Sequence, residues 1–267
     1  MTQVNNDQIH EAVREQYARV ADSDHSNNSC LTGACCTTAS DNAETTSIGL
    51  GYSETEVSDV PQGSNMGLGC GNPRAIASLQ SGETILDLGS GGGFDCFLAV
   101  NEVGQSGHVI GVDMTPEMID KARNNVSKTN HNNVEFRLGE IENLPVADAI
   151  IDVIISNCVI NLSPQKEQVF NESYRVLKPG GRLAISDIVA FVELPENLQD
   201  DMALFTGCMA GASTISEIDK MLKKSGFTDI KIEPKNESRN FIRDWLPNSR
   251  IENHIVSATI EATKPKL

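Results

Sequence analysis

The segment that most constrains the fold of this chain is a short apolar run followed by a turn made almost entirely of glycine. The run Ile85-Leu86-Asp87-Leu88 leads directly into Gly89-Ser90-Gly91-Gly92-Gly93, and a helical pattern comes next. Glycine allows backbone angles that a side chain forbids and lets the main chain approach a ligand closely. In open α/β sheets such a turn lies at the carboxyl end of a strand, where nucleotide-like cofactors bind. The segment therefore predicts a cofactor site of this kind.

Strand-like and helix-like segments alternate from Glu83 to Val189. Each strand-like segment is short and rich in Val, Ile and Leu, and a helical pattern separates it from the next. Such alternation builds a parallel sheet with helices on both faces. We therefore predict an α/β fold with a Rossmann-like, doubly wound sheet. The expected strands are 84–88, 108–112, 134–138, 151–156 and 182–186.

The N-terminal part of the chain has a different texture. Apolar residues recur close to a 3.6-residue period in 6–21, which predicts a helix. From residue 22 to about residue 64 the chain is rich in Ser, Thr, Asn and Gly and contains Cys30, Cys35 and Cys36. A loop of this length exceeds the roughly 12 to 15 residues common in compact domains, so we expect it to be functional or mobile.

The C-terminal part mixes a helical pattern at 215–225 with strand-like runs at 229–233 and 255–261. This mixture predicts a smaller α+β cap that completes the site. The expected division is thus an N-terminal helix and cysteine-containing loop (1–70), a cofactor-binding domain (71–190) and a C-terminal cap (191–267).

Charge and cysteine content exclude several classes of function. The chain has 37 acidic against 21 basic residues and a formal charge of −16, which repels phosphate backbones, so we expect neither nucleic acid nor a membrane as partner. No apolar run approaches the ~20 residues of a membrane span, and no signal-peptide core is visible. The seven cysteines are an odd number without a C-x-x-C pair, which argues against a disulfide framework and an ordinary zinc site. We expect a cytoplasmic, monomeric protein.

The spacing around the glycine turn narrows the choice of cofactor. Phe94 stands where a dinucleotide fingerprint places its third small residue, which disfavours a nicotinamide cofactor. Asp113, about 20 residues beyond the turn, ends the second expected strand, where its carboxylate can accept from both ribose hydroxyls. The pattern indicates an adenosine without a 2′-phosphate.

Further landmarks follow in a fixed order: Gly139-Glu140-Ile141-Glu142-Asn143-Leu144-Pro145, then the strand ending Ser156-Asn157, then Leu177-Lys178-Pro179-Gly180-Gly181. Over roughly 79–189 the chain resembles the class I S-adenosylmethionine-dependent methyltransferases. The resemblance implies that Asp87 and the glycine turn hold the methionine end of S-adenosylmethionine and that Asp113 holds its ribose. It also implies that Met114 packs on the adenine, that Glu140 accepts from the adenine amine and that the Ile141 amide meets a ring nitrogen. Met114 as simple core packing and Glu140 as a solvated acid remain alternatives. The cofactor-binding residues implied in this way are Asp87, Gly89, Ser90, Gly91, Gly93, Asp113, Met114, Glu140, Ile141 and Asn157.

Three cysteines lie at positions that the expected fold brings together. Cys158 follows the fourth strand, at the end that faces the ligand crevice. Cys70 lies in a glycine-rich turn before the first strand, and Cys208 lies after the fifth strand, in a segment that in this class usually folds back over the crevice. A single free cysteine is more often a small buried residue than a ligand. Convergence of three beside a methyl donor is harder to attribute to packing.

The motifs around these cysteines make the resemblance specific to one family, the arsenite methyltransferases. Gly69-Cys70-Gly71, Asn157-Cys158-Val159-Ile160-Asn161-Leu162 and Gly207-Cys208-Met209-Ala210-Gly211-Ala212 resemble its arsenic-binding motifs. Ala34-Cys35-Cys36-Thr37-Thr38 resembles its N-terminal redox motif, in which we assign the redox role to Cys35 by register while Cys36 stays open. Cys30 has no assigned part, and Cys96 is expected in the core.

The resemblance implies methyl transfer from S-adenosylmethionine to trivalent arsenic held by Cys70, Cys158 and Cys208. Soft thiolates suit this soft centre. Cys35 would complete a thiol/disulfide cycle that an external dithiol, such as thioredoxin, resets. Two alternatives remain open at this point. One is a small-molecule C- or O-methyltransferase of the quinone-precursor type, which the 4% aromatic content disfavours. The other is a non-catalytic metalloid-binding protein.

Overall fold

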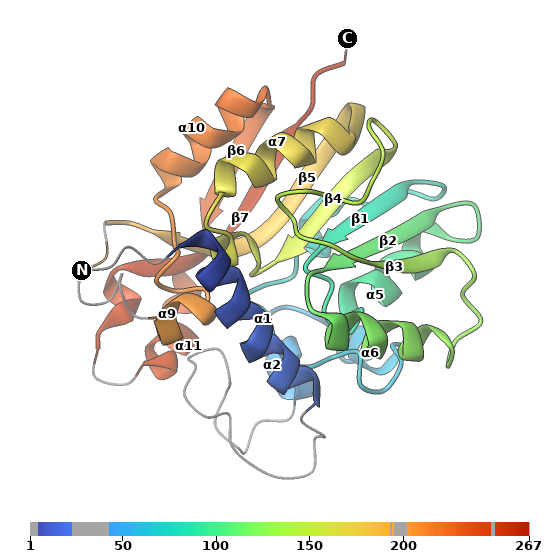
Figure 1. The fold of residues 1–267 in the computed structure, drawn as a ribbon, viewed down its shortest axis with the longest axis horizontal. Helices are drawn as coiled ribbons and strands as arrows, with labels where there is room; N and C mark the ends of the chain where they lie inside the picture. The colour runs from blue at the N-terminus through green and yellow to red at the C-terminus, as the bar shows by residue number, and fades with distance from the viewer. Residues whose placement is uncertain (1–4, 23–42, 193, 195–201, 247–248, 267) are drawn as a thin grey trace.

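A seven-stranded sheet organises the protein (Figure 1). The computed structural model describes residues 5–22, 43–192, 194, 202–246 and 249–266. The strands follow the order β3-β2-β1-β4-β5-β7-β6. Six of them run in the same direction, and β7 runs in the opposite direction. The strands are β1 (Thr84–Leu88), β2 (His108–Asp113), β3 (Val134–Leu138), β4 (Ile151–Asn157), β5 (Leu177–Ala190), β6 (Thr228–Pro234) and β7 (Ile255–Thr263).

The predicted doubly wound sheet is confirmed. The strand order reverses between β1 and β4, which is the topological switch point where such folds bind ligands. The predicted strand bounds agree with the structure to within a residue except at β7, which ends at Thr263 rather than at 261, and at β5. That strand extends from Leu177 to Ala190 because its second half pairs with β7, from Ile188 opposite Ser257 to Ala190 opposite Ile255.

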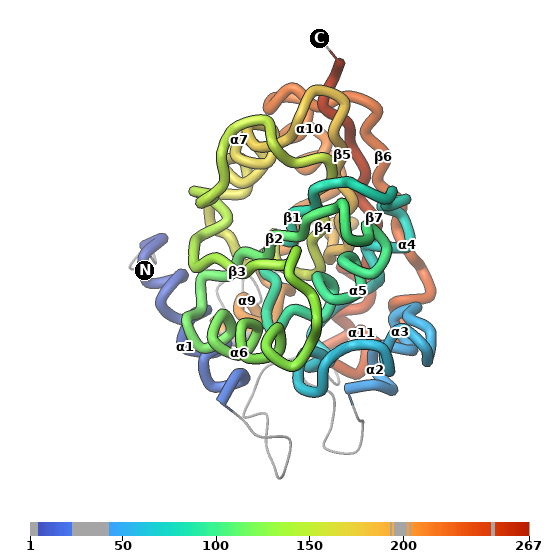
Figure 2. The backbone as a smooth tube through the Cα atoms, turned by 90° about the vertical axis from the view of Figure 1, so that its right-hand side faces the viewer, coloured from blue at the N-terminus to red at the C-terminus, as the bar shows by residue number. Residues whose placement is uncertain are grey.

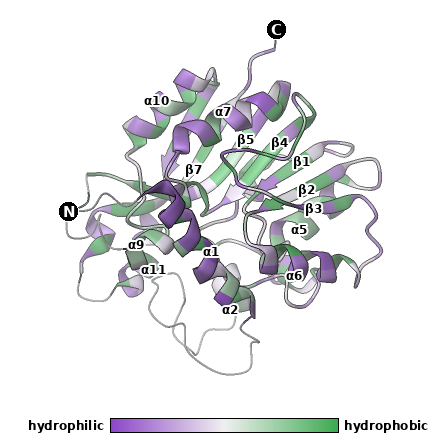
Figure 3. Cartoon of the chain, viewed as in Figure 1, coloured by the Kyte–Doolittle hydropathy of each residue, from purple (hydrophilic) through white to green (hydrophobic). Residues whose placement is uncertain are grey.

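Alternation along the strands buries both faces of the sheet. In β1, Leu86 and Leu88 point into the cluster that also contains Phe170 and Leu222, whereas Ile85 belongs to the cluster on the other face. Figure 3 shows the central strands in the green of apolar residues between helices whose outer faces are purple. The first face is covered by α7 (Lys166–Val176) and α10 (Ile215–Ser225), and the second by α4 (Arg74–Ala77), α5 (Phe94–Val103) and α6 (Pro116–Val126).

The C-terminal strands do not form a sheet of their own. β7 pairs with β5 over nine residues, from Arg182 opposite Thr263 onward, and β6 pairs with β7. The strands expected in a separate cap therefore continue the central sheet, because the edge of β5 would otherwise expose its backbone hydrogen-bonding groups. Two further helices of this region are α9 (Met202–Thr206) and α11 (Arg239–Trp245). They pack in a separate apolar cluster that also contains Cys70, Cys158 and Cys208. The domain boundaries stay a prediction.

The N-terminal helix is present, and part of the expected loop is helical. α1 (Asn6–Asp22) contacts both α6 and α9, and Figure 2 shows it at the left edge of the view, beside α6. Within the segment expected as loop, α2 (Ala43–Gly49) and α3 (Glu54–Ser58) form short helices. The Ser53 hydroxyl accepts from the Glu56 amide and the Glu56 carboxylate accepts from the Ser53 amide, a capping box that stabilises a helix too short to show a periodic pattern. Residues 23–42 lie outside the described residues. Among those described, no helix has the length and apolarity needed to cross a membrane.

The continuity of the sheet predicts the effect of a truncation in β7. Ile260 is 2% exposed and lies opposite Ile185, so Ile260→Ala removes core packing shared with the central sheet. We expect a loss of about 2–5 kcal/mol in the free energy of unfolding within one cooperative transition, measured by urea denaturation followed by circular dichroism. Ile150→Ala, at an exposed isoleucine, is the matched control and should change stability by no more than about 0.5 kcal/mol. A separate transition that alone responds to Ile260→Ala would contradict a shared core.

Candidate functional site

The glycine turn after β1 packs directly against the turn after β4. Gly89 has φ +70°, and a Cβ at this position would lie 2.1 Å from Cγ2 of Val159. Gly93, with φ +93°, is the N-cap of α5, and a Cβ there would meet the rings of Phe136 and Phe97. At both positions the positive φ disfavours any residue other than glycine, and the neighbouring side chains leave no space for a Cβ atom. The two turns are thereby held together at the switch point of the sheet.

Asp113 organises the opposite wall of the crevice. Its Oδ2 accepts a hydrogen bond from the Gly91 amide at 3.0 Å, and its Oδ1 accepts from the Thr115 amide at 2.9 Å. Burial raises the pKa of this carboxyl, while hydrogen bonds from Thr115 and Gly91 act in the opposite direction. The carboxylate is thus fixed beside the glycine turn, where a ribose would lie.

A pocket opens between these segments, at the carboxyl ends of β1, β2 and β4. Most residues predicted to bind the cofactor line it, together with two of the three cysteines. Gly93, Glu140 and Cys70 are not among its lining residues. The predicted residues that line the pocket are Asp87, Gly89, Ser90, Gly91, Asp113, Met114, Ile141, Asn157, Cys158 and Cys208.

Helix α1 contributes residues to the pocket that sequence reasoning missed. The Nε2 of the buried His10 lies 3.1 Å from a carboxylate oxygen of Glu142, and both residues line the pocket. Glu140, by contrast, is 40% exposed and accepts from Arg14 of the same helix at 3.2 Å. Its assignment to the adenine amine stays a prediction. The position of His10 inside an amphipathic helix carries no sequence signal that it faces a pocket formed by distant segments.

Asn157, at the end of β4, connects the pocket with the loop that carries Cys70. Its Oδ1 accepts from the Cys70 amide at 3.1 Å, and its Nδ2 donates to the Gly71 carbonyl at 2.8 Å. The same Nδ2 lies 3.1 Å from the Tyr52 hydroxyl, which in turn donates to Asp95 at 2.7 Å. Burial raises the pKa of both Tyr52 and Asp95, while the hydrogen bond from Tyr52 acts to lower the pKa of Asp95. Tyr52 and Asp95 also line the pocket and were not singled out from the sequence.

The structure brings Cys70, Cys158 and Cys208 together from three distant segments. The Cys208 thiol donates to the Cys158 carbonyl at 2.8 Å, and the sulfurs of Cys70 and Cys158 lie within 4.8 Å of each other. Interaction with the thiols of Cys208 and Cys70, followed by burial, raises the pKa of Cys158, and burial raises that of Cys70. All three are at least 93% buried, and the raised pKa values keep the thiols of Cys70 and Cys158 protonated in the absence of a ligand.

Two of these cysteines have backbone angles that disfavour side chains. Cys158 has φ +61° and Cys208 has φ +62°, the left-handed region that few residues other than glycine adopt. Such conformations cost about 1–2 kcal/mol and concentrate at functional sites. Cysteine at both positions indicates that the thiol, rather than ease of folding, determines the residue.

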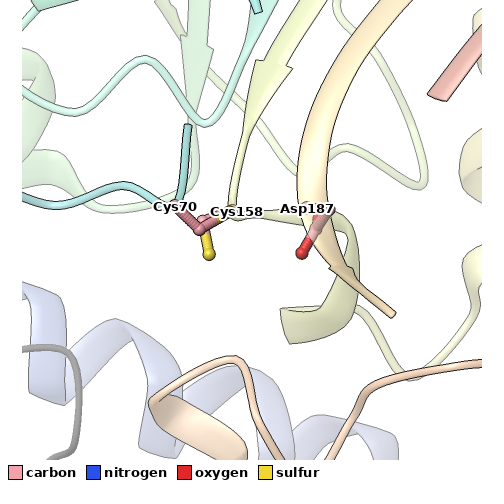
Figure 4. A group of neighbouring side chains, drawn as sticks. All are labelled: Cys70, Cys158 and Asp187. Carbon is pink, nitrogen blue, oxygen red and sulfur yellow. The ribbon is translucent and has the colours of Figure 1, made fainter. Parts of the chain in front are cut away.

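Asp187 lies beside the thiols and was not predicted. Its carboxylate oxygen and the sulfurs of Cys70 and Cys158 all lie within 4.8 Å of one another (Figure 4). Burial, with Cys208 nearby, raises the pKa of Asp187 to about 8 against the opposing hydrogen bonds from Ile188 and Ile160. Position 187 falls just beyond the predicted end of the fifth strand, and a lone acid there gives no sequence signal.

The remaining cysteines divide as follows. Cys96 is fully buried on α5 and donates to an Asp87 oxygen at 3.3 Å. It belongs to the apolar cluster on the second face, consistent with the expected core position. Cys30, Cys35 and Cys36 lie outside the described residues.

The residues of the pocket fit an adenosine bearing an amino-acid tail. The glycine turn leaves a wall without side chains, Asp113 supplies a fixed acceptor pair for ribose hydroxyls, and the apolar side chains of Met114 and Ile141 lie beside it. Together with the strand order and the antiparallel β7, these features define a class I S-adenosylmethionine-dependent methyltransferase fold.

Comparison with known proteins identifies the family. A methyltransferase domain model matches residues 79–226. The arsenite methyltransferase of Halobacterium salinarum is 53% identical over 97% of this chain and 67% of its own length. That of Aquipseudomonas alcaligenes is 38% identical over 84% of this chain and 63% of its own length, so both relatives are longer than this chain. The crystal structure of an arsenic(III) S-adenosylmethionine methyltransferase from Chlamydomonas reinhardtii superimposes with a TM-score of 0.62 at 31% identity, covering 85% of this chain and 74% of that one. The chain belongs to the arsenite methyltransferase family.

The contact between Gly89 and Val159 predicts the effect of replacing this glycine by alanine. Gly89→Ala should displace the turn after β4 and abolish saturable binding of S-adenosylmethionine in an isothermal titration. Gly82→Ala is the matched control, because Gly82 also has a positive φ of +88° but a Cβ there meets only Ser106 Oγ at 3.5 Å. Both variants should lose roughly 1–2 kcal/mol from the left-handed angle, and only Gly89→Ala should lose the cofactor. Equal binding of S-adenosylmethionine by the two variants would show that the glycine turn does not form part of the cofactor site.

Proposed function

We propose that this protein transfers the methyl group of S-adenosylmethionine to trivalent arsenic held by Cys70, Cys158 and Cys208. The observation that carries the proposal is the convergence of three buried thiols from separate segments at the wall of a cofactor pocket. Membership of the arsenite methyltransferase family supports it.

The protonation state of the thiols suits the capture of arsenite. Arsenite presents hydroxyl groups on a soft centre, and sulfur is the ligand such a centre prefers. Each thiol that binds gives up its proton and displaces one hydroxyl, and the two leave together as water. Thiols with a raised pKa, such as those of Cys70 and Cys158, therefore need no general base for this step.

The pocket residues act by positioning. S-adenosylmethionine, when bound, supplies an electrophilic methyl group on its sulfonium. The glycine turn and Asp87 would hold the methionine end and Asp113 the ribose, while Asn157 fixes the Cys70 loop against the same pocket. Arsenic on three sulfurs is pyramidal and carries a lone pair as its nucleophile. Holding donor and acceptor in line contributes up to ~7–11 kcal/mol to such a transfer.

The cysteines outside the described residues complete the proposal. Methylation formally oxidises arsenic by two electrons, and formation of one protein disulfide returns it to the trivalent state. The disulfide requires a second thiol besides that of an arsenic-binding cysteine, and we assign it to Cys35, with Cys36 as the alternative. We assign the reduction of this disulfide to thioredoxin or a small dithiol.

The first test is direct. Purified protein is incubated with S-adenosylmethionine, arsenite and a dithiol, and methylated arsenic species are separated by chromatography with elemental detection. We expect Cys158→Ser to lower the rate at least ~100-fold because the arsenic loses a ligand at the pocket wall. Cys96→Ser, at a buried cysteine outside the thiol cluster, should retain methylation. Cofactor binding without methylated arsenic in the unaltered protein would instead point to another methyl acceptor.

The redox assignment has its own test. Because the disulfide forms after methyl transfer, Cys35→Ser should leave the yield of the first turnover intact and lower the steady-state rate in the presence of thioredoxin, and Cys36→Ser should change neither. Single-turnover quench experiments beside steady-state assays measure the two quantities. If Cys36→Ser alone lowers the steady-state rate, the roles are exchanged; loss of first-turnover yield in either variant would refute a purely reductive role.

A further inference from the structure

The thiol cluster contains a carboxylate for which methyl transfer to arsenic has no use. Asp187 is 2% exposed, and one of its oxygens lies within 4.8 Å of the sulfurs of both Cys70 and Cys158. Trivalent arsenic on three sulfurs carries its lone pair in the fourth direction and gains nothing from an oxygen ligand there. Divalent cations that prefer thiolate ligands do, however, bind to sites that combine cysteine sulfur with a carboxylate oxygen.

The Asp187 carboxylate is held rigidly beside the thiols. Its Oδ1 accepts from Asn161 Nδ2 at 2.9 Å and from the Ile188 amide at 2.7 Å, and its Oδ2 accepts from the Ile160 amide at 2.9 Å. A carboxylate has about four acceptor positions, so these bonds orient the group and leave room for one more partner. Metal ligands are oriented by supporting hydrogen bonds of this kind. Figure 4 shows Asp187 and the two cysteines directed to the same space.

We propose that Cys70, Cys158 and Asp187, with Cys208 alongside, bind a thiophilic divalent cation, Zn²⁺ or Cd²⁺, in competition with arsenite. The proposal shares its thiols with the proposed function but does not depend on methylation. Ligand atoms around a tetrahedral zinc lie roughly 3.5 Å apart, given bond lengths of about 2.0–2.3 Å, so separations within 4.8 Å need to contract by at most about 1.3 Å. Binding converts the two thiols to thiolates and any protonated Asp187 carboxyl to carboxylate, and it releases these protons to solvent with no change in oxidation state.

The cation and arsenite would enter by the same route. Cys158 and Cys208 line the pocket, whereas the buried Cys70 and Asp187 are not among its lining residues. A cation bound at this point occupies the sulfurs that arsenite needs. The bound form is therefore inactive toward arsenite until the cation dissociates, and its thiols are protected from oxidation while it stays.

The test uses Cd²⁺ as the probe, because cadmium bound to thiolate gives an ultraviolet charge-transfer band. Full-length protein with Cys30, Cys35 and Cys36 replaced by serine is titrated so that the band reports on the buried cysteines. Asp187→Asn should lower the Cd²⁺ affinity at least ~10-fold. Loss of a residue that merely supports a metal ligand already lowers affinity by about this factor, and Asp187 is proposed as a ligand itself. Asp152→Asn, at an acid paired with Lys178 at the start of β4, is the matched control and should leave the affinity unchanged.

A second readout separates coordination from a structural effect. Arsenite binding to the same variants is measured by equilibrium dialysis, and the ratio of Cd²⁺ to arsenite affinity should fall at least ~10-fold in Asp187→Asn. A variant that merely loosens the site would weaken both and leave the ratio unchanged, which would overturn the role of Asp187. Cys70→Ser should remove the Cd²⁺ band while Asp187 stays in place, and persistence of the band would assign it to other thiols.

Competition completes the experiment. Protein loaded with Cd²⁺ should take up no arsenite until a chelator is added, and simultaneous binding of both would contradict a shared site. Absence of the band in the parent protein would overturn the inference and leave the methylation assay unaffected. A normal band in a protein that forms no methylated arsenic would have the opposite meaning, with the proposed function lost and the cation site retained.

Discussion

The contact between Gly89 and Val159 is the constraint on which the rest of the site depends. Because a side chain at Gly89 would occupy the space of Val159, the turn after β1 and the turn after β4 lie closer together than any other residue at position 89 would allow. The first turn forms the wall of the cofactor pocket, and the second carries Cys158 in a left-handed conformation. The separation between the two chemical halves of the site is thus set by backbone packing at the switch point of the sheet.

The polar groups of the site are buried in an environment that disfavours charge. Burial raises the pKa of Asp113 and Asp187, and interaction with the neighbouring thiols, with burial added, raises that of Cys158. A neutral thiol cluster avoids the mutual repulsion that adjacent thiolates would suffer in a medium of low dielectric constant. It also keeps the thiols poorly reactive toward oxidants, which attack thiolates. Under the proposed function, arsenite itself, rather than a resident base, takes up the thiol protons.

The sequence predicts most of the fold and the convergence of the cysteines, but it does not predict how the site is closed. Strands such as β1 and β4 were predictable because short runs rich in Ile, Val and Leu alternate with helical patterns along this part of the chain. The placement of β7 beside β5 was not, because a strand-like run does not reveal its partner. His10 reaches the pocket from the N-terminal helix and Tyr52 from within the expected loop, through tertiary contacts that no local pattern encodes. Asp187 escaped prediction for the same reason, since its meaning depends on the turn that Ile160 and Asn161 form against it.

One side chain joins the two functions of the site. Asn157 lines the pocket and, through its amide, holds both the Cys70 amide and the Gly71 carbonyl. A Cβ on Gly69 would approach this same amide to 3.0 Å, so the Cys70 loop has little freedom to move without moving Asn157. A ligand that contacts Asn157 from the pocket therefore restricts the loop that carries the thiol. Occupancy of the cofactor pocket and the geometry of the thiol cluster are coupled through one amide, and the coupling must act equally in both directions because it is a property of binding free energies.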